Sequence, residues 1–198
     1  MLRIGITGGI GSGKTTVCRI FEVLGIPVFY ADSAAKAVMH TDASLRAEII
    51  EQFGEKSYSD LGELDRKHIS SIVFSDDRQL ARLNAIVHPA VFRAFDAWVY
   101  QQDAPYVLKE AALLFESGSY KMCDQTVLVE SPEMLRIERI MERDHVTEDQ
   151  VRSRMSKQLS DGEKEKLADH ILMNDEQTLL IPQVLSLHNY FLAIANDN

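Results

Sequence analysis

A glycine-rich segment near the N-terminus constrains this chain more than any other feature of its sequence. It reads Gly8-Gly9-Ile10-Gly11-Ser12-Gly13-Lys14-Thr15 and matches the pattern G-x-x-x-x-G-K-[ST]. An apolar run, residues 2–7, precedes the segment, and a helical pattern starts near Lys14. Glycines allow a tight turn that presents backbone N–H groups to phosphate oxygens, and the helix start adds further donors. The segment therefore predicts a binding site for a nucleoside triphosphate.

The polar side chains of this loop suit a triphosphate that is held together with Mg²⁺. Lys14 offers a positive charge to the β and γ phosphates, and the Thr15 hydroxyl is the expected metal ligand. A ligand-free glycine turn is the alternative, but packing gives no reason for the Lys-Thr pair. The expected nucleotide-binding residues of the loop are Gly9, Gly11, Ser12, Gly13, Lys14, Thr15 and Thr16.

Composition narrows the class of protein. The chain has 198 residues, 45% of them hydrophobic and 26% charged, which suits one soluble α/β core with an appended region. The net charge of −9 argues against a protein that coats nucleic acid. Neither a membrane helix nor a signal peptide is evident, so we expect a cytoplasmic protein. Cys18 and Cys123 lack metal-ligand spacing and are expected to be small core residues.

Strands alternate with helices along most of the chain. Five apolar runs are predicted strands: residues 2–7, 26–30, 106–110, 126–129 and 170–173. Helices are expected over residues 14–24 and 175–195. This order predicts a five-stranded parallel sheet of the P-loop NTPase type, with helices on both faces.

Two helical insertions interrupt the alternation. The first, residues 32–103, has helical patterns at 33–40, 44–53, 65–74 and 76–100, and His88-Pro89 is expected to break the last of them. The second, about 132–166, is rich in arginine. We therefore expect a nucleotide-binding core (1–31 plus 104–198), a helical acceptor-binding insertion (32–103) and an arginine-bearing lid (132–166).

Acidic residues follow two of the predicted strands. Asp32 comes just after the second strand and Glu110 ends the third, so both should lie at the sheet edge that carries the glycine loop. Asp32 can accept the proton of an attacking hydroxyl, or it can cap the helix that follows. Glu110 can orient the acceptor or hold Mg²⁺ through water, or it can be a solvated charge at a strand end.

Other candidate residues each have a structural alternative. His88, at the break expected from Pro89, can bind a substrate phosphate or be a structural histidine, and Glu116 can bind substrate or cap a helix. Arg139 and Arg143 share one helix face. Together with Arg154 on the next helix, they can neutralise a transferring phosphoryl group or form exposed ion pairs with nearby acids.

Several of these motifs, in this order, resemble the dephospho-coenzyme A kinases. The resemblance covers nearly the whole chain, and the His-Pro and Leu-Leu-Phe-Glu elements single out this family. The matching segments are Ile4 to Thr15, Ala31-Asp32, Leu83 to Pro89, Leu113 to Glu116, Arg139 with Arg143, Arg154 with Gln158, and Ala168 to Ile171 followed by Asn174. The chain departs from the family at Ala112, where proline is usual, and at Glu133 to Arg136, where the family often has glutamine.

The resemblance implies transfer of the ATP γ-phosphoryl group to the ribose 3′-hydroxyl of dephospho-coenzyme A, with Mg²⁺. It implies that Asp32 is the base, with Lys14 and Arg143 as further catalytic residues and Arg139, Arg143 and Asn174 near the nucleotide. The implied acceptor-binding residues are Asp32, His88, Pro89, Glu110, Glu116 and Arg154. We expect no nucleic-acid or membrane partner and favour a monomer, although the sequence leaves the oligomeric state open.

Two other functions compete with this interpretation. Another small-molecule kinase could act on a nucleoside, a nucleotide or a shikimate-like acceptor, although the long helical insertion disfavours it. A nucleotide-switched regulator of the GTPase type should carry an Asn/Thr-Lys-x-Asp motif, and Asn174-Asp175 does not supply one.

Overall fold

The computed structural model describes residues 1–73 and 76–196 of the chain. Its contacts divide the chain into two compact units, which are described separately. Met1–Tyr30 and Gln102–Asn198 form the first unit, and Ala31–Gln101 form the second. Among the described residues, no helix combines the length and the apolar character that crossing a membrane requires.

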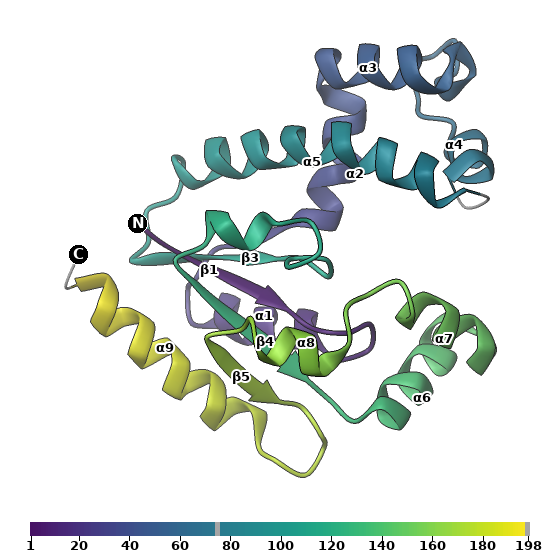
Figure 1. The fold of residues 1–198 in the computed structure, drawn as a ribbon. Coiled ribbons are helices and arrows are strands. Elements are labelled where there is room, and N and C mark those ends of the chain that lie inside the picture. Colours follow the sequence, from purple (N-terminus) through teal and green to yellow (C-terminus); the bar gives the residue numbers. More distant parts are fainter. Residues whose placement is uncertain (74–75, 197–198) are drawn as a thin grey trace. The chain divides into compact units, whose positions relative to one another are not determined.

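The first unit contains a five-stranded sheet in the order β2-β3-β1-β4-β5, with every neighbouring pair parallel (Figure 1). Its elements along the chain are β1 (Leu2–Thr7), α1 (Lys14–Val23), β2 (Val28–Tyr30), β3 (Tyr106–Glu110), the short 3₁₀ helix η2 (Ser119–Met122), β4 (Gln125–Glu130), α6 (Glu133–Asp144), α7 (Glu148–Met155), α8 (Asp161–Glu165), β5 (His170–Met173) and α9 (Leu180–Asn196). The predicted five-stranded parallel sheet is therefore confirmed.

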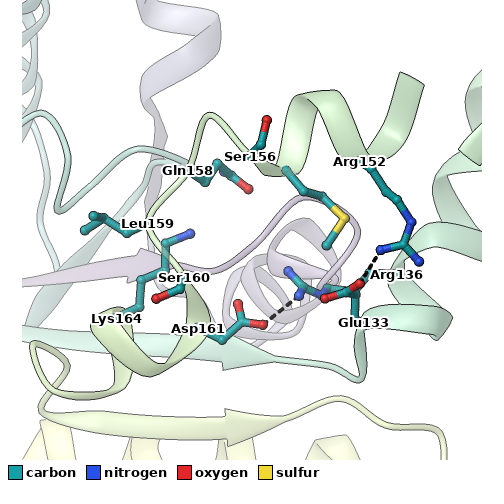
Figure 2. A pocket seen from close by; sticks show the side chains of 10 residues that line it. Glu133, Arg136, Arg152, Ser156, Gln158, Leu159, Ser160, Asp161 and Lys164 are labelled. Carbon is teal, nitrogen blue, oxygen red and sulfur yellow. Dashed lines mark hydrogen bonds and ion pairs between the residues drawn. The ribbon is translucent and has the colours of Figure 1, made fainter. Parts of the chain in front are cut away.

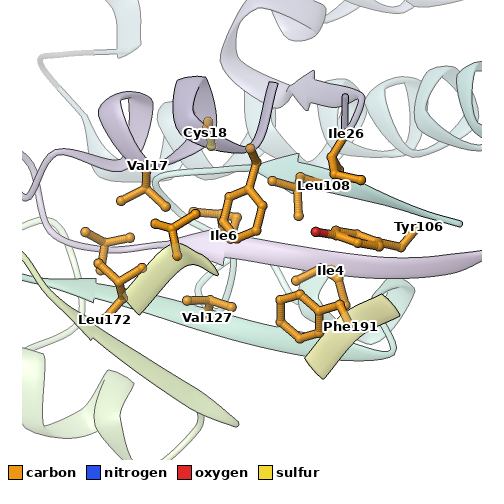
Figure 3. Close-up of a cluster of buried hydrophobic side chains, with 13 residues drawn as sticks. Ile4, Ile6, Val17, Cys18, Ile26, Tyr106, Leu108, Val127, Leu172 and Phe191 are labelled. Atoms are coloured by element: carbon orange, nitrogen blue, oxygen red, sulfur yellow. The ribbon is translucent and has the colours of Figure 1, made fainter. Parts of the chain in front are cut away.

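The main hydrophobic core lies between the sheet and the helices α1 and α9 (Figure 3). Ile4 and Ile6 of β1 point into this core, where Phe21 of α1 and Phe191 of α9 are fully buried. The opposite face of β1 is covered by the segment after β3, since a Cβ built on Gly5 would lie 2.7 Å from Leu114 Cδ2. The central strands β1 and β3 are thus buried on both faces, whereas Ile171 of the edge strand β5 is 50% exposed.

In the first unit, two element boundaries differ from the sequence prediction by more than one residue. The second strand is only Val28–Tyr30 rather than residues 26–30, because Pro27 has no N–H to donate to the sheet. The closing helix begins at Leu180 rather than at Asp175. The Asp175 carboxylate accepts hydrogen bonds from the N–H groups of Gln177 and Thr178, so it stabilises a turn there.

The second unit is helical, as the periodicity of the sequence predicts. It contains α2 (Ala31–Thr41), α3 (Ala43–Phe53), the 3₁₀ helix η1 (Glu55–Ser57), α4 (Arg66–Val73) and α5 (Asp77–Val99). Asp42 caps α3 through the N–H groups of Ser44 and Leu45, and its other oxygen pairs with Arg93 of α5 at 2.9 Å. The end of the predicted helix at Phe74 lies outside the described residues.

The predicted helix break at His88-Pro89 is wrong, because α5 continues through Pro89. Proline removes one helical hydrogen bond and typically costs about 3 kcal/mol in a helix interior. In this helix the Pro89 ring lies on the exposed side, whereas Val87 and Val91 are buried on either side of it. Buried side chains before and after the proline therefore offset its cost.

Candidate active site

The glycine loop connects β1 to α1 in the predicted conformation. Gly11 and Gly13 have φ angles of 80° and 91°, which favour glycine, and Gly13 is the N-cap of α1. Lys14 is 9% exposed, and its Nζ donates to the carbonyl oxygens of Gly8 at 3.0 Å and Gly9 at 3.3 Å. A cation thus lies across the turn of the loop, where phosphate oxygens bind in proteins with this motif.

Two residues from outside the loop contact its carbonyl groups. Asn174, directly after β5, donates from Nδ2 to Ser12 O at 2.8 Å. Arg139 of α6 donates to Gly11 O at 3.3 Å and to Asn174 O at 3.4 Å. The structure therefore brings together the loop, Arg139 and Asn174, which are far apart in the sequence.

A second arginine of α6, Arg136, lies against the same loop. It is 4% exposed, and its Nη2 is 2.6 Å from Asp161 Oδ2 at the start of α8. Arg136 also lines a cavity of about 380 Å³ between α6, α7 and α8 (Figure 2). The other residues that line it are Glu133, Arg152, Met155, Ser156, Gln158, Leu159, Ser160, Asp161 and Lys164.

Gln158 and Glu116 attach the segment between α7 and α8 to the rest of the unit. Gln158 Oε1 accepts from Ile10 N of the loop at 2.9 Å, and its Nε2 donates to Ala112 O at 3.2 Å. Glu116 Oε1 accepts from Leu159 N at 2.9 Å and lies 3.6 Å from the fully buried Lys164 Nζ. Burial lowers the pKa of Lys164, and the nearby Glu116 carboxylate opposes this shift. Glu116 does not cap a helix; it anchors α8 and the segment before it.

The outer arginines of the same region meet at one carboxylate. Arg143 Nε donates to Asp144 Oδ1 at 2.8 Å, and Arg154 Nη1 donates to Asp144 Oδ2 at 2.7 Å. These hydrogen bonds lower the pKa of Asp144 to about 2, and the one from Arg143 has the larger effect. Both arginines are exposed, so they form the surface ion pairs that the sequence offered as their structural alternative.

The remaining predicted site residues have different surroundings. Glu110, at the end of β3, is 7% exposed and is therefore not a solvated charge. In the second unit, Asp32 is exposed within the first turn of α2, which begins at Ala31, so it is not the cap of that helix. His88 stacks on Phe92 in α5, with ring centroids 6.2 Å apart, and Pro89 follows it in the same helix.

The oxygen atoms near the loop fit a Mg²⁺ ion that is bound mainly through a nucleotide. Thr15 is exposed at the second position of α1, and the buried hydroxyls of Thr7 and Ser12 have no hydrogen-bond partner in the described structure. No group of three or more His, Cys, Asp or Glu residues among those described could form a metal cage. Mg²⁺ typically needs only one or two protein oxygens when phosphates and water complete its shell.

Comparison with known proteins places this chain in a family. A family model described as dephospho-CoA kinase matches residues 2–179. The chain belongs to the dephospho-CoA kinase family. The dephospho-CoA kinase of Salinibacter ruber is 46% identical over 178 residues, covering 88% of this chain and 89% of that protein. That of Bacteroides fragilis is 37% identical over 187 residues, covering 94% and 91%. The resemblance that the sequence motifs indicated is confirmed.

Solved structures show the same fold as this member of the dephospho-CoA kinase family. A Thermus thermophilus protein, TT1252, matches with a TM-score of 0.82 at 34% identity over 97% of this chain and 96% of that one. The dephospho-CoA kinase of Campylobacter jejuni matches with a TM-score of 0.68 at 25% identity over 98% of both chains. A shikimate kinase of Bacteroides thetaiotaomicron has a TM-score of 0.52 at 15% identity, which shows a shared fold alone.

Some residues of the site were not singled out from the sequence. Arg136 is one of them, although a signal for it existed: Arg136 and Ile140 are four positions apart on the buried face of α6. An arginine at a buried helical position requires a charged or polar partner, but the sequence does not say which one. Lys164 was missed because its surroundings depend on the segment that crosses from α7 to α8.

Proposed function

We propose that this protein transfers the γ-phosphoryl group of ATP to the ribose 3′-hydroxyl of dephospho-coenzyme A, which yields coenzyme A and ADP. The observation that carries the proposal is the glycine loop with Lys14, Arg139 and Asn174 gathered on it, in a chain that belongs to the dephospho-CoA kinase family. This reaction is the last step of coenzyme A biosynthesis. A cytoplasmic location and a monomeric state stay predictions.

The proposed nucleotide site is the loop from Gly9 to Thr16. Lys14 exchanges its contacts with loop carbonyls for oxygens of the β and γ phosphates. Arg139 and Asn174 hold the nucleotide at the far side of the loop, since both already contact loop carbonyls. Arg143 supplies positive charge to the transferring phosphoryl group, because its exposed side chain can leave Asp144 for a more negative partner. Residues 132–166 act as the lid.

Thr15 is the proposed protein ligand of Mg²⁺, with water and phosphate oxygens as the other ligands. The ion neutralises charge on the phosphates when it is bound.

The proposed general base is Asp32, which accepts the proton of the ribose 3′-hydroxyl. A helix N-terminus favours a carboxylate, and the exposed position of Asp32 in the first turn of α2 leaves it accessible to an acceptor. His88 and Pro89 of α5 are proposed acceptor-binding residues, as are Glu110 and Arg154. Glu116 is a further proposed acceptor-binding residue, and it also holds the segment that carries Gln158 and Leu159 in place.

Two measurements test this proposal. The first is ADP release with a panel of acceptors: dephospho-coenzyme A, adenosine, AMP and shikimate. We expect release with dephospho-coenzyme A, and ³¹P NMR of the product should show a new 3′-phosphate. Release with adenosine, AMP or shikimate but not with dephospho-coenzyme A would favour another small-molecule kinase.

The second measurement is the turnover of Asp32→Asn, which keeps the shape of the side chain but cannot accept the proton. We expect kcat to fall roughly 10²- to 10⁴-fold, with little change in ATP affinity. Unchanged turnover would show that Asp32 is only a charged residue in the first turn of α2.

A further inference from the structure

Arg136 packs against the glycine loop at two positions, Gly9 and Gly11. A Cβ built on Gly9 would overlap Arg136 Nη1 and lie 3.0 Å from Arg136 Cζ. A Cβ built on Gly11 would lie 2.6 Å from the Arg136 carbonyl oxygen. The side chain of one residue thus packs on Gly9, and its backbone packs on Gly11.

A side chain is disfavoured at these two positions for different reasons. Gly11 has a φ of 80°, which L residues rarely adopt, so its backbone alone favours glycine. Gly9 does not have a positive φ. At position 9 the obstacle to a side chain is therefore the Arg136 guanidinium, and not the conformation of the backbone.

Asp161 and the surrounding protein hold the guanidinium in place. Arg136 Nη2 pairs with Asp161 Oδ2 at 2.6 Å, and the Arg136 side chain is 5% exposed against 45% for Asp161 (Figure 2). A buried guanidinium without a carboxylate partner is costly, so Arg136 has little freedom to leave this position. Asp161 lies in the first turn of α8, whose N-cap Ser160 forms a capping box with Glu163. The ion pair therefore connects α8 to the glycine loop at Gly9.

We propose that Arg136 is a positioning residue for the triphosphate. Arg136 fixes the conformation of the glycine loop at Gly9, and it couples the loop to α8 through Asp161. The proposal rests on the proposed function only in that ATP binds at the loop. In this proposal Arg136 acts through the loop and not on the transferred phosphoryl group. Its loss should therefore weaken the binding of ATP more than it slows phosphoryl transfer.

The test is a double-mutant cycle of Gly9→Ala with Arg136→Ala. We expect Gly9→Ala alone to raise the KM for ATP roughly tenfold, because the new methyl group displaces the guanidinium and distorts the loop. Arg136→Ala alone should raise this KM by a similar factor and leave kcat within about threefold. The double variant should be no worse than Arg136→Ala, because the space that the methyl group needs is then empty.

Gly11→Ala provides the matched control. Its added Cβ meets the backbone carbonyl oxygen of Arg136, which remains in Arg136→Ala, and its φ is unfavourable for alanine. Arg136→Ala should therefore not relieve the defect of Gly11→Ala. Asp161→Asn, which removes the charge but keeps a hydrogen-bonding oxygen, should raise the KM for ATP by a smaller factor than Arg136→Ala.

Each outcome of the cycle decides the proposal. If Gly9→Ala is equally damaging with and without Arg136, then phosphate or the loop backbone requires the glycine, and Arg136 is a bystander. If Arg136→Ala does not fold in a thermal unfolding scan, the cycle is repeated with Arg136→Gln, whose shorter side chain also frees the space. Binding of a non-hydrolysable ATP analogue, measured by calorimetry, separates this proposal from the proposed function. Absent binding in the wild-type protein would contradict the nucleotide site itself, whereas wild-type binding without rescue would contradict only the role of Arg136.

Discussion

Two groups of cations in the first unit differ in burial and in the kind of partner they contact. The inner group, Lys14, Arg136 and Arg139, is buried or half-buried and lies against the glycine loop. The outer group, Arg143 and Arg154, is exposed and shares the Asp144 carboxylate. Arg139 and Arg143 are on the same helix, only four residues apart.

One helix, α6, thus carries a buried, a half-buried and an exposed arginine. Arg136 and Arg139 are held against the loop by their contacts with Asp161 and with the Gly11 carbonyl, so we expect them to fix the conformation of the loop. Exposed ion pairs are worth only about 0–1 kcal/mol, so the outer arginines can be released by a more negative partner. We therefore expect inner substitutions to affect nucleotide binding and outer arginine substitutions to affect the chemical step.

Among substitutions of these two groups of cations, the largest expected effect is that of Lys14→Ala. Lys14 belongs to the inner group but is also expected to contact the transferred phosphoryl group, so it should affect both binding and catalysis. We predict a loss of roughly 10²–10³-fold or more in kcat/KM, measured by ADP release. Near-normal turnover would contradict the assignment of the glycine loop as the ATP site.

The difference between the inner and outer cations is tested most directly by the two substitutions Arg143→Ala and Arg139→Ala. Arg143→Ala should lower kcat roughly 10²-fold with a modest change in the KM for ATP, because it removes charge from the transition state. Arg139→Ala should mainly raise the KM for ATP, roughly tenfold, because it loosens the contacts of Gly11 and Asn174. The reverse pattern in steady-state kinetics would show that the inner and outer groups have been assigned incorrectly.

A carboxyl group near the inner cations should make stability depend on pH. Burial, and next the neighbouring Glu165, raise the pKa of Glu130 from 4.5 to about 6, although Arg136 acts against this shift. A raised carboxyl pKa favours folding most below about pH 4.5, and this contribution is lost as the pH rises through about 6. Glu130→Gln should therefore raise the Tm at pH 8 relative to the wild type.

The difference in Tm between Glu130→Gln and the wild type should disappear or reverse near pH 4, where the wild-type carboxyl group is protonated in both states. Thermal unfolding at both pH values measures it. An equal difference in Tm at pH 4 and pH 8 would mean that Glu130 does not titrate in this range.

The smallest expected effect is that of Asp144→Asn in the outer group. The arginines lower the pKa of Asp144 to about 2, so its stabilising contribution is present at neutral pH and is lost as the pH falls from about 4 to about 2. Because the carboxylate is at the surface, Asp144→Asn should leave the Tm at pH 7 almost unchanged, and 1 M salt should abolish any difference. A large loss of stability that persists in salt would show that this ion-pair group is structural and not releasable.

The sequence predicted the strands, the helices and the glycine loop of this protein well, because each depends on local patterns. The five apolar runs became the five strands, and the glycine loop connects β1 to α1 as its motif required. The helices of the second unit were predicted, except that α2 begins at Ala31 rather than Ser33 and that no break occurs at Pro89. That error arose because the rule for proline considers one turn of helix, whereas buried residues on both sides of Pro89 stabilise α5.

The sequence by itself determined the family, the parallel sheet and the phosphate-binding loop, because glycine spacing and apolar periodicity act over a few residues at a time. Only the tertiary structure decided which arginines lie against the loop and which remain at the surface. Arg136, Arg139 and Arg143 look alike in the sequence, but their partners Asp161, Asn174 and Asp144 are separated from them by 25, 35 and 1 residues. Burial and partner choice depend on how distant segments pack, and that information is not present in any short stretch of the chain.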